Sequence, residues 1–184
     1  RGTIQADATS AGLPTGSQSY HVSLEFKCDA SMTNDAVLYS WGLSATNQMN
    51  GLYFPSPVSG SEQKFEHYWF NDNLHYHYSS SFCDGSWHQV ETAYDGTTRS
   101  IWLDGVLGAS DQPAGSTHAS VNSNFCLGAE VARNNFGFIG EIRNFGVWSS
   151  SAERVCSLGP VVVDSGQSCV HASHSLITSV SDCS

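Results

Sequence analysis

Residues 82–105 have the pattern of two strands joined by a tight turn, and this feature most constrains the fold. Their sequence is FCDGSWHQVETAYDGTTRSIWLDG. Residues 87–94 alternate with the period of two that is typical of a strand, and Asp95-Gly96 is a strong hairpin signal. Residues 100–104 alternate again before a second turn signal at Asp104-Gly105. The segment therefore predicts a β-hairpin.

Other short strands at regular spacing extend this prediction along the chain. In Tyr20–Cys28, the odd positions His21, Ser23, Glu25 and Lys27 are polar and the even positions are mostly apolar, which indicates a half-buried strand. Further strands are expected at 35–42, 52–54, 64–70, 74–78, 124–130 and 137–148, with a turn at 71–73 and a loop at 111–117. Strands of this length and spacing favour an all-β sandwich or barrel over βαβ units.

Two of these segments resemble a known family. The order DG, WH, alternating strand, YDG and W-x-DG in 84–105 resembles the central hairpin of laminin G-like and pentraxin-like domains, which have the concanavalin A-type jelly roll. The sequence FIGEIRNFGVW at 138–148 is similar to the closing strand of laminin G-like jelly rolls, which a short helix follows. Ser150 and Glu153 fit a capping box, so a short helix is expected near 151–156. The resemblance implies a concanavalin A-like jelly-roll β-sandwich of two antiparallel sheets.

The resemblance to laminin G-like domains suggests that the chain has three parts. Residues 1–12 form an amino-terminal extension, residues 13–156 the laminin G-like jelly roll, and residues 157–184 a cysteine-rich carboxy-terminal extension held by disulfides. Val161, Val162 and Val163 favour an extended conformation within that tail.

The cysteines indicate an oxidising compartment. There are six and no C-x-x-C pair, so a zinc ribbon or a redox motif is improbable. Three belong to the jelly roll and three to the tail or its root: Cys28, Cys83, Cys126, Cys156, Cys169 and Cys183. Because both sets are odd, at least one disulfide must join tail to domain if all six pair within the chain. The alternative is an unpaired or intermolecular cysteine, and the sequence does not fix the connectivity.

Composition indicates a secreted protein and excludes two classes of partner. The formal net charge is −10 and the only lysines are Lys27 and Lys64. We therefore expect neither nucleic acids nor anionic membrane surfaces as partners, because both need clustered cations. No apolar run approaches the length of a membrane-spanning helix, so membrane insertion is not expected. The chain begins at Arg1, which suggests a processed secreted product or a piece of a longer protein.

Catalytic motifs are missing from the sequence. A retaining glycoside hydrolase of this fold resembles E-x-D-x-x-E, which places two carboxylates about 5 to 5.5 Å apart on one strand face. No such triplet occurs, and Glu91 stands alone in its strand. We therefore expect no enzymatic activity.

The best candidate ligand site lies in 67–78, HYWFNDNLHYHY. Sugar recognition uses flat aromatic faces together with amides and carboxylates that bind adjacent hydroxyls. The candidate ligand-binding residues are Tyr68, Trp69, Asn71, Asp72, Asn73 and His75. The alternative is that the aromatic residues belong to the hydrophobic core and that residues 71–73 have only the usual role of such residues in a turn. His75 and His77 share one strand face, but no third metal ligand is identifiable.

Calcium is implied only by the family resemblance. Similar domains often bind calcium through loop carboxylates, and Asp72 is the preferred side chain, although no calcium-loop motif is present. The leading interpretation is a secreted, non-enzymatic, lectin-like or adhesive module that binds an extracellular glycan or glycoprotein. The alternative is a structural subunit of an extracellular fibre or matrix, in which copies assemble through 1–11 or through the tail.

Overall fold

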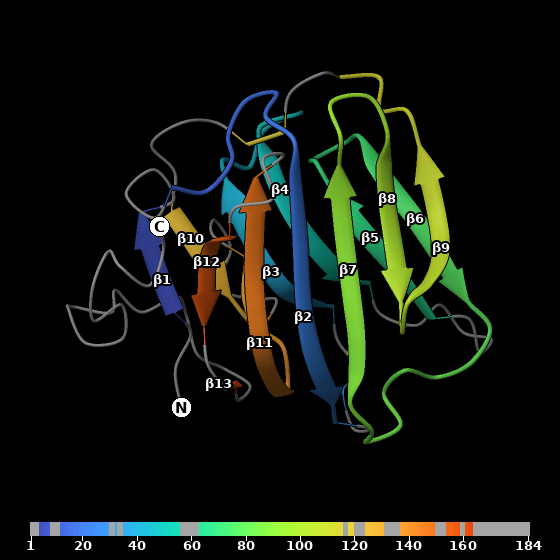
Figure 1. The fold of residues 1–184 in the computed structure, drawn as a ribbon. Helices are drawn as coiled ribbons and strands as arrows, with labels where there is room; N and C mark the ends of the chain where they lie inside the picture. The colour runs from blue at the N-terminus through green and yellow to red at the C-terminus, as the bar shows by residue number, and fades with distance from the viewer. Residues whose placement is uncertain are drawn as a thin grey trace.

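The described part of the chain consists of two stacked antiparallel sheets (Figure 1). The computed structural model describes residues 4–7, 12–29, 32, 35–55, 63–115, 118–119, 124–130, 137–149, 154–158 and 161–163. These residues contain strands and no helix, so no described helix is long and apolar enough to cross a membrane. The predicted jelly-roll sandwich is confirmed.

Sheet A, the rear layer in Figure 1, has six strands. In spatial order they are β1 (Ile4–Asp7), β10 (Asn124–Leu127), β3 (Ala36–Gly42), β4 (Met49–Phe54), β5 (Gln63–Tyr68) and β6 (Asn73–Tyr78). Sheet B, the front layer, has seven strands. In order they are β12 (Arg154–Leu158), β11 (Gly140–Ser149), β2 (Tyr20–Cys28), β7 (His88–Tyr94), β8 (Arg99–Leu103) and β9 (Val106–Asp111), with β13 (Val161–Val163) also paired to β11.

Side chains alternate between the two faces of each strand, and those that point inward fill the space between the sheets with aromatic rings. In β2, Tyr20, Leu24 and Phe26 point inward and are nearly inaccessible, as the period of two predicts. The Phe26 ring lies 5.4 Å from that of Phe54 in the opposite sheet. This apolar layer is the main source of the free energy that holds the sheets together.

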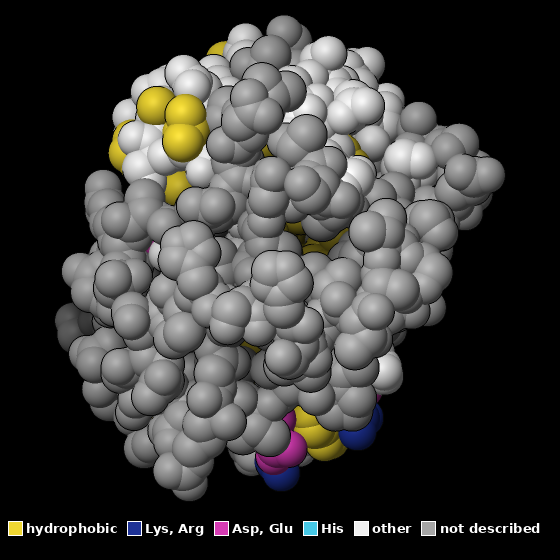
Figure 2. Space-filling model, turned by 90° about the vertical axis from the view of Figure 1, so that its left-hand side faces the viewer, with side chains coloured by type: hydrophobic (Ala, Val, Ile, Leu, Met, Phe, Trp, Pro, Cys, Tyr) yellow, Lys and Arg dark blue, Asp and Glu magenta, His cyan; other side chains and the backbone are white. Residues whose placement is uncertain are grey.

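Cross-strand ion pairs line the outer face of sheet B. Arg143 stands opposite Glu25, and their Nη2 and Oε2 atoms are 2.6 Å apart. Glu141 stands opposite Lys27, with Oε1 and Nζ separated by 3.4 Å. Figure 2, a view from the side of β1 and β12, also shows described basic and acidic side chains next to one another at the lower margin. Much of this outer face is thus neutralised in pairs.

The predicted helix near 151–156 is wrong. Strand β12 begins at Arg154 and pairs with β11, with Cys156 opposite Val147. Because β2 occupies only one side of β11, the other side offers backbone hydrogen bonds to an extended segment, and the β-branched Val155 favours that conformation. Tertiary pairing here overrides the local capping signal, while residues 151–153 lie outside the described set.

Parts of both extensions pair with the jelly roll. Strand β1 adds to β10 at the edge of sheet A, with Ile4 opposite Leu127. Strand β13 pairs with β11, with Val163 opposite Gly140. The rest of both extensions, including Cys169 and Cys183, lies outside the described residues.

A disulfide ties the end of β2 to the loop before β7. Cys28 and Cys83 are bonded across a sequence separation of 55 residues. Cys126 is also disulfide-bonded. These bonds agree with the prediction of a disulfide-stabilised chain.

Candidate functional site

The hairpin of β5 and β6 places the predicted ligand residues on opposite faces of sheet A. Tyr68 and His75 point outward, and His75 stands opposite Glu66 in the register. The His75 Nε2 atom lies 3.2 Å from Glu66 Oε1, which also accepts from Lys64 Nζ at 2.8 Å. The outer face therefore has mixed charge, with Tyr68 beside it.

Two of the predicted amides stabilise the turn between these strands. Phe70 and Asn71 have φ angles of 59° and 66°, the left-handed conformation that a tight turn requires. The Asn71 side chain donates to Thr46 Oγ1 at 3.2 Å, and Asn73 Oδ1 accepts from the Trp69 backbone N–H at 3.2 Å. These contacts give both amides a structural role.

Trp69 lies in the core. Its side chain is 0% exposed, and its indole N–H donates to the Tyr20 hydroxyl at 3.0 Å. The Arg99 guanidinium lies 4.5 Å from the centre of its ring. The Trp69 ring thus packs between the sheets and presents no face at the surface, which differs from the predicted stacking on a sugar.

Asp72 binds protein donors through both carboxylate oxygens. Oδ1 lies 3.2 Å from Arg99 Nη2, and Oδ2 accepts from the Gly115 backbone N–H at 3.0 Å. Within the described ranges, no three His, Cys, Asp or Glu side chains lie together as a metal site. The arrangement around Asp72 therefore does not fit a calcium ion without displacing these donors.

A groove lies on the outer side of sheet B, at the upper ends of β11, β2 and β7 in Figure 1. Its volume is about 730 Å³, and we call it the Trp148 groove. It is lined by Ser19, Tyr20, His21, Ala93, Tyr94, Asp95, Trp148 and Ser149. Strand register brings them together, because Trp148 stands opposite His21 and His21 opposite Ala93.

An aromatic shelf forms one wall of this groove. The His21 and Trp148 rings are stacked, with centres 5.4 Å apart and planes inclined by 30°. A Cβ atom at Gly146 would lie 2.6 Å from Trp148 Cη2, so the glycine lets the indole lie across its own strand. The His21 Nε2 atom is 2.7 Å from Glu91 Oε2, which fixes the imidazole. The glycine and the contact with Glu91 thus hold the two rings of the shelf in place.

The charge of the groove is negative. Backbone N–H groups of Thr98 and Thr97 donate to Asp95 Oδ1 at 2.7 and 2.8 Å. These hydrogen bonds lower the pKa of Asp95, so the carboxylate is ionised at neutral pH. No Lys or Arg is among the described lining residues. The groove therefore disfavours an anionic ligand and suits one that donates hydrogen bonds.

Sequence reasoning missed this groove although two signals were present. Trp148 closes the FIGEIRNFGVW motif, which was interpreted only as a marker of the fold. His21 occupies the polar side of β2. What the sequence does not reveal is the register that places these two side chains together.

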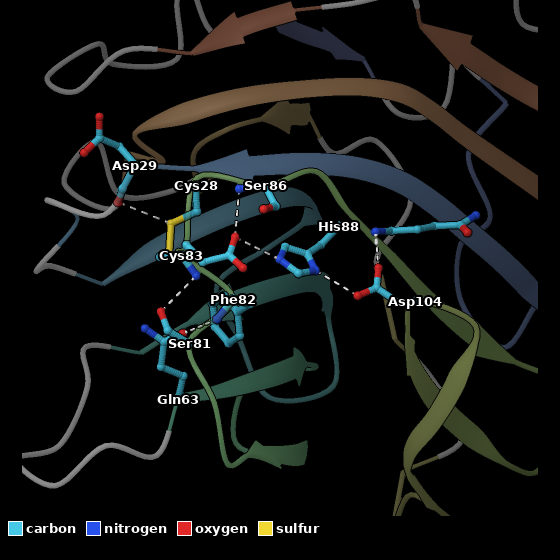
Figure 3. Close-up of polar contacts among 11 residues, drawn as sticks. Cys28, Asp29, Gln63, Ser81, Phe82, Cys83, Ser86, His88 and Asp104 are labelled. Carbon is cyan, nitrogen blue, oxygen red and sulfur yellow. Dashed lines mark hydrogen bonds and ion pairs between the residues drawn. A yellow bond between two sulfur atoms is a disulfide. The ribbon is translucent and has the colours of Figure 1, made fainter.

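A second polar cluster, around His88, clamps a loop to a turn (Figure 3). His88 Nδ1 lies 2.8 Å from Asp104 Oδ2, and Nε2 lies 3.3 Å from Asp84 Oδ1. Partial burial lowers the pKa of His88, but the hydrogen bonds to Asp104 and Asp84 outweigh it and raise the pKa overall. Asp104 also accepts from the Gln89 backbone N–H at 2.9 Å. The DG motifs at 84–85 and 104–105 and the WH motif at 87–88 are thus parts of one structural contact.

Comparisons with known proteins agree with the architecture. Residues 1–154 match the family model Laminin_G_3, described as the concanavalin A-like lectin/glucanases superfamily. No curated protein matches the chain.

Solved structures similar to this chain share its fold at low sequence identity. Mouse laminin alpha1 domains LG4-5 align with TM-score 0.56 and 16% identity over 91% of this chain and 44% of theirs. Domain 4 of the arabinanase AbnA from Geobacillus stearothermophilus, solved in complex with arabinotriose, aligns with TM-score 0.51 and 17% identity over 75% of this chain and 63% of that one. The SAP-like pentraxin from Limulus polyphemus aligns with TM-score 0.55 and 13% identity, covering 73% and 65%. This chain thus spans less than two thirds of each of these three structures.

Proposed function

Because the chain belongs to the concanavalin A-like lectin/glucanases superfamily, we propose that it is a secreted, non-enzymatic module that binds a neutral glycan in the Trp148 groove. The observation that carries the proposal is the shelf formed by His21 and Trp148, with ring centres 5.4 Å apart. Structures of this fold include a domain solved with arabinotriose, which supports a carbohydrate-binding or adhesive role.

The groove has the groups that recognise a sugar ring. The C–H face of a pyranose or furanose stacks on the indole of Trp148, which supplies apolar area at a small cost in conformational entropy. The Asp95 carboxylate accepts hydrogen bonds from sugar hydroxyls, and Ser19 and Ser149 lie at the same groove. Since the carboxylate is ionised and no cation lines the described wall, a neutral sugar is preferred over a uronic or sialic acid.

The spacing of acidic groups supports a binding role over hydrolysis. Glu91 and Asp95 are the acidic residues of β7 and its end, and they stand four positions apart. Four residues of a strand span about 13 Å, which exceeds the separation of about 5 to 9.5 Å used by glycoside hydrolases. Glu91 is also hydrogen-bonded to His21.

Titration with neutral oligosaccharides tests the proposal. Arabinotriose and gluco- and manno-oligosaccharides are added to ¹⁵N-labelled protein while the indole N–H signals are followed by NMR. We expect a Kd in the micromolar to millimolar range, about −8 to −4 kcal/mol, with the Trp148 indole signal shifting. Sialyllactose of the same length should bind more weakly.

Three variants locate the site. Trp148→Ala should abolish binding. Trp102→Ala, which removes a partly exposed indole on β8, three strands along the same sheet from β11, should leave binding unchanged. Tyr68→Ala tests the outer face of β5 and β6. Loss of binding in Tyr68→Ala with retention in Trp148→Ala would refute the groove, and no binding across a neutral glycan array would refute the function.

A fibre or matrix subunit is the other candidate function. The segments proposed to mediate assembly include 4–7 and 161–163, and these form β1 and β13 paired with strands of the same chain. Assembly through them would require an exchange of these strands between copies. This observation favours the glycan-binding module.

A further inference from the structure

One wall of the Trp148 groove is supported from inside the molecule by a residue that belongs to no strand. This wall, which we call the β2–β7 wall, consists of residues 19–20 at the start of β2 and residues 94–95 at the end of β7. His118 lies in the connection between β9 and β10 and is not among the lining residues. It is fully buried. Its contacts decide how firmly the wall is held.

Two backbone hydrogen bonds join the segment of His118 to the turn before β2. The Gly16 N–H donates to the Ala119 carbonyl at 2.6 Å, and the His118 N–H donates to the Gly16 carbonyl at 2.9 Å. The turn itself is closed by the Gln18 N–H, which donates to the Thr15 carbonyl at 3.2 Å. These bonds bring the His118 side chain to the segment that leads into β2.

The imidazole of His118 makes one hydrogen bond within the described part of the chain. Its Nε2 atom lies 2.8 Å from the Gln18 carbonyl oxygen, and because a carbonyl only accepts, Nε2 carries the proton and donates. Burial lowers the pKa of His118 to about 4, so the ring is neutral and Nδ1 has no proton. Nδ1 is buried and has no hydrogen-bond partner among the described residues. The single bond thus fixes the peptide group that precedes Ser19.

The same ring packs against both halves of the β2–β7 wall. Its centre lies 4.7 Å from that of Tyr20 and 6.0 Å from that of Tyr94, with interplanar angles of 74° and 78°. Such edge-to-face contacts are favourable between aromatic rings. The Tyr94 hydroxyl in turn donates to the Gly96 carbonyl at 2.9 Å, in the turn that carries Asp95. One buried side chain is therefore connected to both strands of the wall.

We propose that His118 is a positioning residue of the glycan site and holds the two halves of the β2–β7 wall at a spacing at which Ser19 and Asp95 bind one sugar. This role rests on the proposed function. A Cβ atom at Gly96 would lie 3.7 Å from Ser19 Oγ, so the Ser19 hydroxyl already lies against the turn after β7. Polar groups that are fixed before binding lose less conformational entropy when the ligand arrives. Without the imidazole donor, the Gln18 carbonyl loses its partner and the segment before β2 is free to move.

Two substitutions separate the hydrogen bond of His118 from its packing. His118→Phe keeps a flat ring and removes the donor, whereas His118→Gln keeps an N–H donor at a similar reach from the backbone. Phe54→Leu is the control, because Phe54 is 2% exposed, packs on the Phe82 ring and does not line the groove. It should lower the free energy of unfolding by leaving a cavity, without disturbing the wall.

Amide hydrogen exchange in the absence of ligand measures the wall itself. In His118→Phe, the amides of residues 16, 18 and 118 should exchange about tenfold faster than in the wild-type chain, because the segment that they fasten opens locally. His118→Gln should keep them near the wild-type rate, and Phe54→Leu should not accelerate them selectively. Equal protection of these amides in the wild-type chain and in His118→Phe would overturn the proposal.

Titration with the neutral oligosaccharide that binds the wild-type chain most tightly measures the consequence for the site. His118→Phe should raise the Kd about tenfold, because the wall must then be ordered at the moment of binding. His118→Gln should restore the wild-type Kd, and Phe54→Leu should leave it unchanged below the unfolding transition. A rise of equal size in Phe54→Leu and His118→Phe, or no rescue by glutamine, would reduce His118 to an ordinary core residue.

The wild-type chain gives a further measurement that needs no substitution. On saturation with the oligosaccharide, the His118 Nε2–H signal in a ¹⁵N NMR spectrum should shift and its exchange with water should slow. An unchanged signal would contradict the coupling between His118 and the groove. If no oligosaccharide binds the wild-type chain, the proposed function and this role both fail. If the wild-type chain and His118→Phe bind equally well, the role of His118 alone fails.

Discussion

The guanidinium of Arg99 lies 4.5 Å from the centre of the Trp69 ring, and both side chains are fully buried between the two sheets. Arg99 also binds Asp111 and Asp72, so one cation joins β8, β9 and the turn after β5. Burying a charge is costly unless partners surround it, and this site supplies two carboxylates, a carbonyl and an aromatic face. The contact explains why Trp69 and Asp72 belong to the scaffold.

Replacing Arg99 by Met should therefore destabilise the fold strongly. It leaves the carboxylates of Asp111 and Asp72 without their buried partner, which costs about 3 to 5 kcal/mol. Arg143→Met is the control, because Arg143 is 38% exposed and its pair with Glu25 contributes about 0 to 1 kcal/mol. Urea unfolding measures both, and equal losses would contradict the assigned role of Arg99.

Acid should destabilise the protein through two buried histidines. Burial lowers the pKa of His118 to about 4, and burial followed by the charge of Arg99 and then His118 lowers the pKa of His67 well below its usual range. Their stabilising contribution is present above the unfolded-state pKa near 6.5 and is lost as pH falls towards the folded-state values. For His118 alone the loss between pH 6.5 and 4 is about 3 kcal/mol.

Unfolding free energies measured every half pH unit check this effect. His118→Asn should flatten the decline in that window, whereas His77→Asn, at an exposed position, should leave it unchanged. An identical pH profile in wild type and His118→Asn would contradict the prediction.

His88 should titrate in the opposite direction. Its hydrogen bonds to Asp104 and Asp84 outweigh partial burial and raise its pKa, so its contribution to stability is present below pH 6.5 and is lost as pH rises through the folded-state pKa. A proton NMR titration should place His88 above 6.5. Asp104→Asn should lower that pKa, and a value unaffected by this substitution would argue against the contact drawn in Figure 3.

The sequence predicts those parts of the structure that are determined by contacts between residues close together in the chain. Strand β2 was predicted with its bounds, because burial of one face imposes a regular alternation from Tyr20 to Cys28. The same alternation places Trp69 on the face of Phe65 and Tyr68 on the face of the charged Lys64 and Glu66, so it indicates that Trp69 points into the core. What it does not indicate is the contact with Arg99, which lies 30 residues away in the sequence.

Long-range register explains the remaining differences. His21 and Trp148 lie far apart in the chain and meet only because β2 and β11 pair with these residues opposite one another. The capping signal at Ser150 and Glu153 is local, whereas the strand that begins at Arg154 is stabilised by the open side of β11. In both cases the deciding partner is a strand that the local pattern does not identify.

Cys126 should be joined to the carboxy-terminal part of the chain. It is disulfide-bonded, and Cys28 and Cys83 are bonded to each other, so the partner is expected among Cys156, Cys169 and Cys183. Cys126 lies fully buried on β10, opposite Ser40 of β3, in a position where a bond fastens a distant segment to sheet A. Removing this bond by Cys126→Ser should cost about 2 to 5 kcal/mol in unfolding free energy.

Peptide mapping without reduction checks the connectivity. The digest should contain one peptide that links Cys126 to a tail cysteine and another that links Cys28 to Cys83. Ser40→Ala is a matched control at the facing position of β3, since it removes a hydroxyl that donates to the Ala129 carbonyl at 3.0 Å and leaves every disulfide intact. Its map should be unchanged. Alkylation of Cys126 in the unreduced, denatured protein, or a bond from Cys126 to a second molecule, would contradict an intrachain link between tail and jelly roll.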